Sequence, residues 1–365
     1  MRYFDHNATH PLSPAAREAW LDAMERFIGN PSSPHRLGDR ADRALNDARE
    51  RLAGWLGCGA ADLVWTSGAT ESNNTAVAHF AIEGDREAWV SAIEHPSVLA
   101  AVRRHFTGRH RLIPVRRDGV VEVDWLRAEL SRSRPAFIGV MAANNETGVL
   151  QPWRALLALC REHDVPFFCD AAQWVGKLCA LGLGACEVVT GCAHKFGGPP
   201  GVGFLKAPAR LRPLIVGGPQ EDGRRAGTEN VPGVLAMIAA LAEREGGAER
   251  IALREQFEAE LREVLPGIEI VGASAERLWN TVSAIMPEID CRQRWVVKLD
   301  KLGFAVSTGS ACASGKEEPS HVLAAMGFTA AQAARVLRFS SGWETSPADW
   351  SALRDGLIRA VRELA

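Results

Sequence analysis

A single lysine, Lys195, has the most unusual chemical setting in this sequence of 365 residues. It lies in residues 191–201, a stretch rich in glycine and proline that reads GCAHKFGGPPG. A β-branched run precedes this stretch and an apolar run follows it, so the pattern predicts a tight loop between two buried strands. Lysine is rarely buried without a use, and burial lowers the pKa of its amine, which can then condense with an aldehyde. A surface lysine on a hairpin loop is the alternative interpretation.

An amine that condenses with an aldehyde indicates pyridoxal phosphate (PLP), which also requires a carboxylate beside its ring nitrogen. Asp170 follows the apolar run 165–169 and supplies such a carboxylate. A partly buried carboxylate needs a partner, and a protonated ring nitrogen would be one. The alternative is that Asp170 caps a helix. Gln173, three residues later, could form a hydrogen bond with a phenolic oxygen of the same ring.

Two more polar residues follow predicted strands. His95 comes after the strand predicted at 89–91, and Asn145 after the strand predicted at 137–141. The flat ring of His95 could stack on a cofactor and shuttle protons, although a lone histidine is more often structural. Ligands bind beyond the carboxyl ends of parallel strands, so we expect both residues to lie near Asp170 and Lys195.

Residues 66–74 form a turn between a predicted strand and a predicted helix, with small and hydroxyl side chains that include Thr70. The first N–H groups of a helix lack internal partners, and together with the helix dipole they attract an anion. Gly68 lets the backbone come close to such an anion. A G-K-[ST] sequence does not follow, so this is not a nucleotide P-loop. A capped helix start is the alternative.

Later segments add further candidates. The loop at 216–230 contains adjacent arginines and Thr228, which suit a phosphate or a carboxylate, although it could equally be a solvated surface loop. Cys312 lies among small residues beside Lys316, where a cysteine is placed to act as a nucleophile. Arg338 has apolar neighbours, a setting in which a guanidinium commonly binds a carboxylate. Cys192 and His194 are one residue apart without a second pair, so we predict no zinc site.

Alternating strands and helices must position these residues. From residue 63 to residue 170 the alternation predicts an α/β fold, with a mostly parallel sheet and helices on both faces. One long helix is predicted over about 231–265, and a smaller α/β unit follows it. We therefore expect a large domain at 1–245 and a small domain at 246–365 that carries Cys312 and Arg338. The N-terminal arm, 1–14, is expected to pack on the small domain, and Asn7 in it is polar enough to line a pocket.

Composition excludes several classes of protein. Hydrophobic residues make up 47% and charged residues 24% of the sequence, which is ordinary for a globular protein. A net charge of −2 gives no basic field for nucleic acid. The eight cysteines form no C-x-x-C pair, and the sequence shows neither a signal peptide nor an apolar run long enough to span a bilayer. These features predict a cytoplasmic protein.

Short motifs occur together over nearly the whole chain, from 5–9 (DHNAT) to 338–340 (RFS). The most specific are 66–72 (TSGATES), 144–148 (NNETG), 170–173 (DAAQ), 194–195 (HK), 225–230 (RAGTEN) and 309–312 (GSAC). With these motifs the sequence resembles the PLP-dependent cysteine desulfurases of the class-V aminotransferase family, of the type used for iron–sulfur cluster assembly. The resemblance implies an aspartate aminotransferase-like fold and a homodimer.

The resemblance also implies a role for each candidate residue. Lys195 would form the Schiff base, Asp170 would bind the ring nitrogen, His95 would stack on the ring and Gln173 would meet its phenolic oxygen. The remaining implied ligands are, for the phosphate, Ala69, Thr70, Cys192, His194 and, from the other subunit, Thr228; and for substrate, Asn7, Asn145 and Arg338. Asn145 would also contact the cofactor. Cys192 stands where the family usually has serine, and a thiol is the weaker donor.

The implied reaction removes sulfur from L-cysteine, giving L-alanine and a persulfide on Cys312. The sulfur then passes to an acceptor protein for iron–sulfur cluster, thio-cofactor or tRNA synthesis, and the sequence leaves that acceptor open. Two alternatives also remain open. One is a selenocysteine or cystine lyase of the same fold, and the other is a non-catalytic sulfur-relay subunit.

Overall fold

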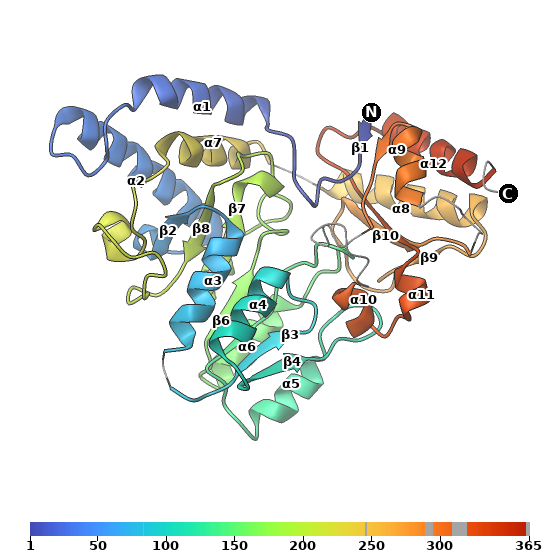
Figure 1. The fold of residues 1–365 in the computed structure, drawn as a ribbon, viewed down its shortest axis with the longest axis horizontal. Helices are drawn as coiled ribbons and strands as arrows, with labels where there is room; N and C mark the ends of the chain where they lie inside the picture. Colours follow the sequence, from blue (N-terminus) through green and yellow to red (C-terminus); the bar gives the residue numbers. More distant parts are fainter. Residues whose placement is uncertain (83, 245–246, 289–294, 309–319, 363–365) are drawn as a thin grey trace.

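A seven-stranded sheet forms the centre of the larger part of the molecule (Figure 1). The computed structural model describes residues 1–82, 84–244, 247–288, 295–308 and 320–362. Along the sheet the strands are β2 (Leu63–Thr66), β8 (Gly203–Lys206), β7 (Val188–Cys192), β6 (Phe167–Asp170), β5 (Phe137–Gly139), β3 (Ala88–Ser91) and β4 (His110–Ile113). Strand β8 runs antiparallel to both its neighbours, and the other neighbouring pairs are parallel. The predicted α/β fold with a mostly parallel sheet is confirmed.

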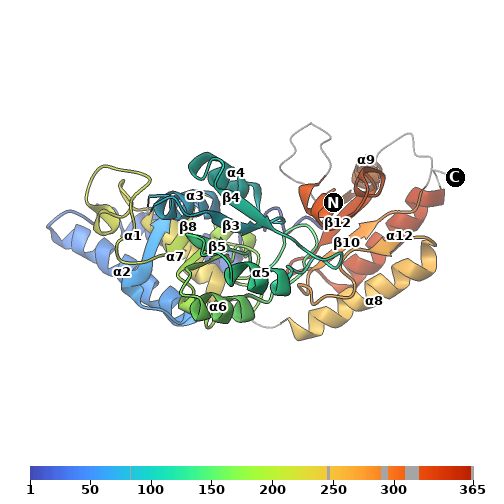
Figure 2. The same ribbon diagram turned by 90° about the horizontal axis from the view of Figure 1, so that it is seen from below.

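Helices cover both faces of this sheet because successive side chains of a buried strand point to opposite faces. The helices are α1 (Pro14–Arg26), α2 (Arg36–Leu56), α3 (Ala69–Phe80), α4 (Pro96–His105), α5 (Val123–Leu130), α6 (Trp153–Glu162) and α7 (Val231–Ala242). In β3, Trp89 packs in the core beneath α2, α5, α6 and α7, whereas Val90 packs beneath α3 and α4. Figure 2 shows the two layers on either side of the sheet. We call this sheet and its helices the large body.

The rest of the chain forms a smaller unit, which we call the small body. Its antiparallel sheet has the order β12 (Val336–Ser340), β10 (Thr281–Ile285) and β9 (Glu269–Ile270). The other elements are α8 (Ala248–Val264), α9 (Trp295–Lys301), β11 (Phe304–Ala305), α10 (His321–Ala325), α11 (Ala330–Ala333) and α12 (Pro347–Arg362). Phe257 of α8 and Leu357 of α12 share one core with Phe339 of β12. Ile93 of the large body packs with Val322 and Met326, so apolar contacts join the two bodies.

The prediction of one long helix over 231–265 is wrong. Helix α7 packs in the core of the large body and ends at Ala242, and α8 begins at Ala248 in the small body. Two glycines at 246 and 247 separate the apolar segment from the charged one, and glycine is a poor helix former. Helix α2 ends at Gly57, whose φ of 75° lies in the left-handed region that favours glycine.

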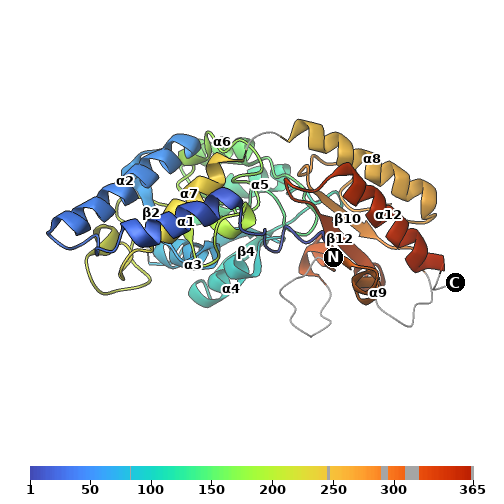
Figure 3. The ribbon, with the colours of Figure 1, turned by 90° about the horizontal axis from the view of Figure 1, so that it is seen from above.

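The N-terminal arm connects the two bodies. Strand β1 (Arg2–Tyr3) pairs in parallel with β11, and Asp5 forms a bridge with Ser340 of β12. The chain then enters α1, which lies across α7 of the large body, as Figure 3 shows. The arm therefore carries residues 4–13 along the junction, where the site described below is located. Among the described residues, no helix has the length and apolar character needed to cross a membrane.

Candidate active site

The floor of the site is a buried carboxylate at the end of β6. Asp170 is 5% exposed, and its Oδ1 accepts the backbone N–H of Ala172 at 2.9 Å. Its Oδ2 accepts the side-chain amide of Asn73, on α3, at 2.8 Å. The same amide donates to Ser97 Oγ at 2.9 Å, and its oxygen accepts Thr190 Oγ1 at 2.6 Å. Asn73, which the sequence interpretation missed, therefore fixes the carboxylate against strands and helices of one body.

His95 belongs to the same hydrogen-bonded network. It is the residue before the first turn of α4, and its Nδ1 accepts the backbone N–H of Ser97 at 3.2 Å and lies 2.8 Å from Ser97 Oγ. Burial lowers the pKa of His95, the carboxylate of Asp170 opposes that shift, and the charge of Lys195 adds to it. His95 thus lies within electrostatic range of both Asp170 and Lys195, and its neutral ring is favoured.

Lys195 follows β7 in a short 3-10 turn, η3 (Ala193–Lys195). Its side chain is half-buried rather than deeply buried, and Nζ donates to the backbone oxygens of Asn7 at 2.8 Å and Ala8 at 2.7 Å. The arm therefore binds the amine directly. The neighbouring His194 lies with Nδ1 3.2 Å from Thr9 Oγ1, and burial, together with the charge of Lys195, lowers its pKa to about 4.

The turn into α3 has the features of an anion site. Gly68, the residue before the first turn of α3, supplies no capping side chain, and the space where its Cβ would lie is open; its φ of 149° is one that a larger residue would rarely adopt. Gly203 of β8 passes so close beneath that an added Cβ would lie 2.6 Å from the Cα of Gly68. The thiol of Cys192 interacts with the N–H of Ala69, and burial raises the pKa of Cys192 to about 11, so the thiol stays neutral. Thr70 is exposed at the same turn.

Arg338 lies across the site in β12 and is 1% exposed. Its guanidinium donates to Asp5 Oδ1 at 2.6 Å and to the backbone oxygen of Asn145 at 2.9 Å. Asn145 is half-buried and lies six residues after the end of β5 at Gly139. A carboxylate from the arm thus already contacts this arginine, and the small body supplies the guanidinium.

Asn7 joins these parts. Its side-chain amide donates to the oxygen of Asn145 at 3.1 Å and to Thr281 Oγ1 at 2.9 Å, and its backbone N–H donates to Ser340 Oγ at 3.0 Å. Gln173, which is 4% exposed, donates through Nε2 to the backbone oxygen of Asn7 at 2.9 Å. Asn7 therefore lies where the arm and both bodies meet, next to the residue expected at the phenolic oxygen.

The structure also shows a residue that the sequence interpretation missed completely. Lys177 is 3% exposed, far more buried than Lys195, and bonds to the side-chain oxygens of Asn7 and Gln173. A single lysine within the otherwise apolar stretch 174–181 was the signal that could have identified it. Two buried acidic residues were also missed. Glu94 precedes His95 and Glu146 follows Asn145, so each is next to a predicted site residue.

Thr228 lies apart from these residues in this chain. It is exposed, and a small groove over the 3-10 turn η4 (Gln220–Gly223) brings it together with Ser67 and Arg225. Arg225 pairs with Glu71 at 3.0 Å, while the buried Arg224 binds backbone oxygens. Both arginines therefore have protein partners.

Two further short 3-10 turns among the described residues are η1 (Ala60–Asp62) and η2 (Leu183–Ala185).

Cys312 and Lys316, four positions later, lie outside the described residues. The residues on either side are anchored at the site. Ser307 exchanges backbone hydrogen bonds with Arg338 at 2.7 and 3.2 Å, and Ser320 donates to Glu146 Oε2 at 2.5 Å. His321 Nε2 lies 2.9 Å from the backbone oxygen of Glu94.

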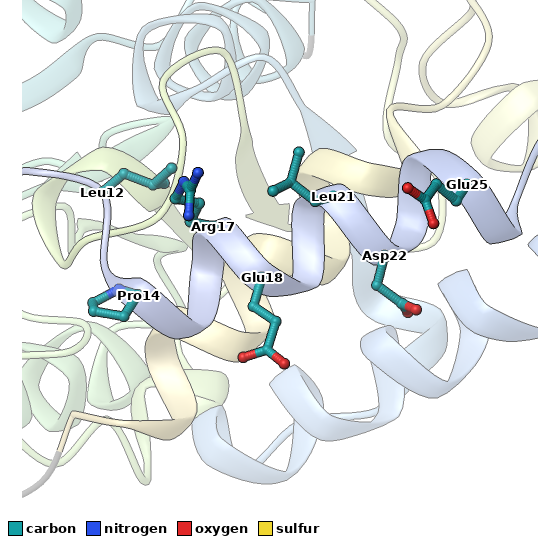
Figure 4. A pocket seen from close by; sticks show the side chains of 7 residues that line it. All are labelled: Leu12, Pro14, Arg17, Glu18, Leu21, Asp22 and Glu25. Carbon is teal, nitrogen blue, oxygen red and sulfur yellow. The ribbon is translucent and has the colours of Figure 1, made fainter.

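A different hollow lies over the outer face of α1, and Figure 4 shows the side chains that line it. They are Leu12, Pro14, Arg17, Glu18, Leu21, Asp22 and Glu25. Three of these side chains are acidic, three are apolar and one is an arginine, and none of the predicted site residues lies there.

The residues at the strand ends fit a phosphorylated pyridine aldehyde. The uncapped turn at Gly68 suits a phosphate, the fixed oxygens of Asp170 suit a ring N–H, and the amine of Lys195 lies within electrostatic range of the same histidine as Asp170. Among the described residues, no group of histidine, cysteine and acidic side chains could hold a metal ion.

Comparison with known proteins agrees with this geometry. The family described as Aminotransferase class-V matches residues 2–353. A cysteine desulfurase of Gluconacetobacter diazotrophicus is 38% identical, over 100% of this chain and 94% of that protein. The cysteine desulfurase IscS of Dictyoglomus turgidum is 35% identical, over 99% of this chain and 95% of that protein.

Solved structures show the same fold. A NifS-like protein from Rickettsia africae superposes with a TM-score of 0.89 at 29% identity, covering 99% of each chain. SspA in complex with cysteine superposes with a TM-score of 0.81 at 28% identity, covering 93% of this chain and 98% of that one.

Proposed function

We propose a reaction for this chain, which belongs to the class-V aminotransferase family and, within it, to the cysteine desulfurases. In this reaction L-cysteine loses its sulfur and leaves as L-alanine. The observation that carries the proposal is the convergence of Asp170, His95 and Lys195 at the strand ends, opposite the carboxylate-binding Arg338.

Enzymes of this family use PLP, and we propose that this chain holds it with the residues at the strand ends. Ala69, Thr70, Cys192 and His194 would bind the phosphate, and Asp170 the ring nitrogen. Lys195 Nζ would provide the covalent attachment, and Gln173 a hydrogen bond to the ring oxygen. When bound, the cofactor supplies a ring that withdraws electrons from the α-carbon of the substrate.

The polar groups of the chain bind and orient the substrate. A bidentate guanidinium suits a carboxylate, and the contact between Arg338 and Asp5 supports this role for Arg338. We propose that Asn7 and Asn145, which lie beside it, take part in substrate binding. Ser97 donates its backbone N–H to Nδ1 of His95, so the neutral ring holds its proton on Nε2 and can donate from there.

The sulfur passes to Cys312 in this proposal. The thiolate of Cys312 forms a bond with the substrate sulfur as the carbon–sulfur bond breaks, and the α-carbon fragment takes up protons and leaves as alanine. The resulting persulfide then exchanges with a thiol of an acceptor protein. Support comes from the anchors at Ser307 and Ser320, which hold the ends of the Cys312 segment to Arg338 and Glu146.

We also propose a cytoplasmic homodimer in which Thr228 reaches the phosphate site of the partner subunit. Thr228 is exposed in its own chain, and the preceding loop exposes Leu214, Ile215 and Val216. Contiguous exposed apolar side chains commonly mark an interface. Light scattering of the purified protein measures this oligomeric state.

Mass spectrometry after incubation with L-cysteine tests the proposed function. We expect one added sulfur on the peptide that contains Cys312 and an equivalent yield of alanine. Cys312→Ser should abolish the added sulfur, while Cys179→Ser, at an exposed cysteine, should leave it unchanged. Alanine formed from selenocysteine or cystine but not from cysteine would contradict the proposal, as would a wild-type protein that forms no alanine.

A further inference from the structure

Lys177 is a buried amine to which the proposed reaction gives no role. It lies in the turn after β6, four residues beyond Gln173, and it is 3% exposed. The indole N–H of Trp279 donates to the backbone oxygen of Lys177 at 3.0 Å, so its position is fixed from the small body as well. Burying an amine is unfavourable unless its N–H groups find partners.

The partners of Lys177 are two neutral amides. Its Nζ donates to Asn7 Oδ1 at 2.7 Å and to Gln173 Oε1 at 2.5 Å. Among the described residues, no carboxylate forms an ion pair with it. Burial holds the pKa of Lys177 well below its usual range, and the charges of Lys195 and Arg338 lower it further. The amine is therefore close to the catalytic lysine and to the carboxylate-binding arginine.

These two bonds help to determine which way each amide faces, and Asn280 also donates to Asn7 Oδ1 at 3.1 Å. An amide has one accepting and one donating end, and nothing intrinsic to Asn or Gln selects between them. The amine of Lys177 has at least two N–H donors, and both amides present their oxygens to it. The N–H2 group of Gln173 then points to the backbone oxygen of Asn7, and the N–H2 group of Asn7 points to Asn145 and Thr281.

The same chain of contacts reaches Lys195. The backbone oxygen of Asn7 accepts both Gln173 Nε2 at 2.9 Å and Lys195 Nζ at 2.8 Å. Lys177 therefore contacts directly both Gln173, the residue expected at the ring oxygen, and Asn7, whose backbone oxygen binds Lys195, so a single residue separates it from the catalytic amine.

We propose that Lys177 is a positioning residue of the desulfurase, which acts through Gln173 and Asn7. It fixes the N–H2 group of Gln173, which donates one N–H to the Asn7 carbonyl and has the second available for the cofactor ring oxygen, and it keeps that carbonyl in place for Lys195. This inference rests on the proposed function. A purely structural lysine would affect stability alone, whereas a positioning residue also affects the bound cofactor.

Lys177→Met tests the proposal because methionine keeps the length of the side chain and removes the donors. We expect a folded protein whose affinity for PLP and whose kcat/KM each fall about 10-fold, the value of one buried hydrogen bond. We also expect the pH midpoint of the visible absorption of the bound cofactor to rise by about half a unit. A site with fewer hydrogen-bond donors favours the protonated form of the bound cofactor. Lys206→Met is the matched control, since Lys206 donates to backbone oxygens at Cys186 and Glu187.

A double-mutant cycle with Gln173→Ala tests the route of the effect. If Lys177 acts through Gln173, the double variant should bind PLP within about twofold of Gln173→Ala alone, since coupled sites are not additive. If the losses of PLP affinity in Lys177→Met and Gln173→Ala instead multiply in the double variant, Lys177 does not act through Gln173. A folded Lys177→Met protein with wild-type affinity, kcat/KM and absorption midpoint would overturn the proposal.

Lys177→Gln keeps the test decisive if Lys177→Met does not fold. Glutamine retains one N–H2 donor, so we expect most of the PLP affinity and the absorption midpoint to recover. A folded Lys177→Gln protein with the losses expected for Lys177→Met would contradict a donor role. Affinity and absorption are measured without L-cysteine, so a protein that forms no alanine refutes the proposed function and leaves the readout on Lys177 intact.

Discussion

Two buried asparagines organise the two sides of the site in different ways. Asn73 bonds to Asp170, Ser97 and Thr190, which all belong to the large body. The partners of Asn7 are divided: on the small body they are Thr281, Asn280 and Ser340, and on the large body Asn145, Gln173, Lys177 and Lys195.

The difference shows which parts of the site depend on docking of the two bodies. The Asn73 network follows from one sheet and the helices packed on it, so Asp170 and His95 are oriented by the large body alone. The Asn7 network exists only where the arm, β10 and β12 meet the large body. We infer that the cofactor floor tolerates motion between the bodies, whereas the substrate side requires their contact.

Buried titratable groups give the two sides opposite pH dependences. Beside the floor, burial raises the pKa of Glu94 to about 8, and nearby Asp170 adds to this shift. Because this pKa is above the value in the unfolded chain, the stabilisation is complete below about pH 4.5 and is lost as pH rises toward 8. Beside Asn7, burial lowers the pKa of His6 to about 3, and His10 adds to this shift. Its stabilisation is complete above about pH 6.5 and is lost as pH falls toward 3.

The largest effect is expected from breaking the floor. Asn73→Leu removes the only side-chain amide between Asp170 and Ser97 among the described residues, so the carboxylate and His95 lose their fixed positions. Misplaced catalytic groups typically lower rates about 100-fold, and we expect that loss in kcat. Steady-state kinetics with L-cysteine measures it. Asn74→Leu, at the next position of α3, should stay near wild type, and equal losses in the two variants would contradict the assignment.

A smaller effect is expected from breaking the junction. Asn7→Ala leaves the backbone oxygen that binds Lys195 but removes the amide shared by Thr281 and Lys177. Unpaired buried polar groups cost about 1–3 kcal/mol each, so we expect the free energy of unfolding to fall by about 2 kcal/mol. KM should rise about 10-fold with a smaller change in kcat, because we propose that the substrate binds on this side.

Urea unfolding and steady-state kinetics measure both effects. Asn46→Ala, at an exposed amide bonded to Asp42, is the control. A loss in kcat as large as that of Asn73→Leu, at unchanged KM, would show that the two asparagines do not differ as described.

The last effect concerns stability rather than catalysis and separates the two sides by pH. Glu94→Gln keeps the shape of the buried side chain and removes its ionisation, so the stability lost on the alkaline side should disappear. In the wild type the free energy of unfolding should fall as the pH rises between about 4.5 and 8. Urea unfolding at a series of pH values measures it. The acid-side loss from His6 should persist in Glu94→Gln, and an unchanged alkaline loss would contradict the role of Glu94.

The amino-acid sequence by itself determined the α/β alternation, the placement of Asp170 and Lys195 after strands, and the family. These features follow from local patterns: apolar runs form buried strands, glycine and proline form turns, and a polar residue after a parallel strand reaches the binding edge. The end of α2 at Gly57 was predictable for the same reason. The division of 231–265 into two helices was not, because the break depends on α7 and α8 packing into different cores.

Only the tertiary structure decided which polar residues connect. Asn73 and Asp170 are 97 positions apart, and Asn7 and Lys177 are 170 positions apart, so no local pattern relates them. The glycine- and proline-rich loop made Lys195 conspicuous in the sequence, yet Lys177 is the more buried lysine. Its burial depends on contacts with Asn7 of the arm and with Trp279, which are distant in the sequence. A hydrogen bond requires two groups within about 3 Å, and for distant residues that distance is set by the packing of the whole chain.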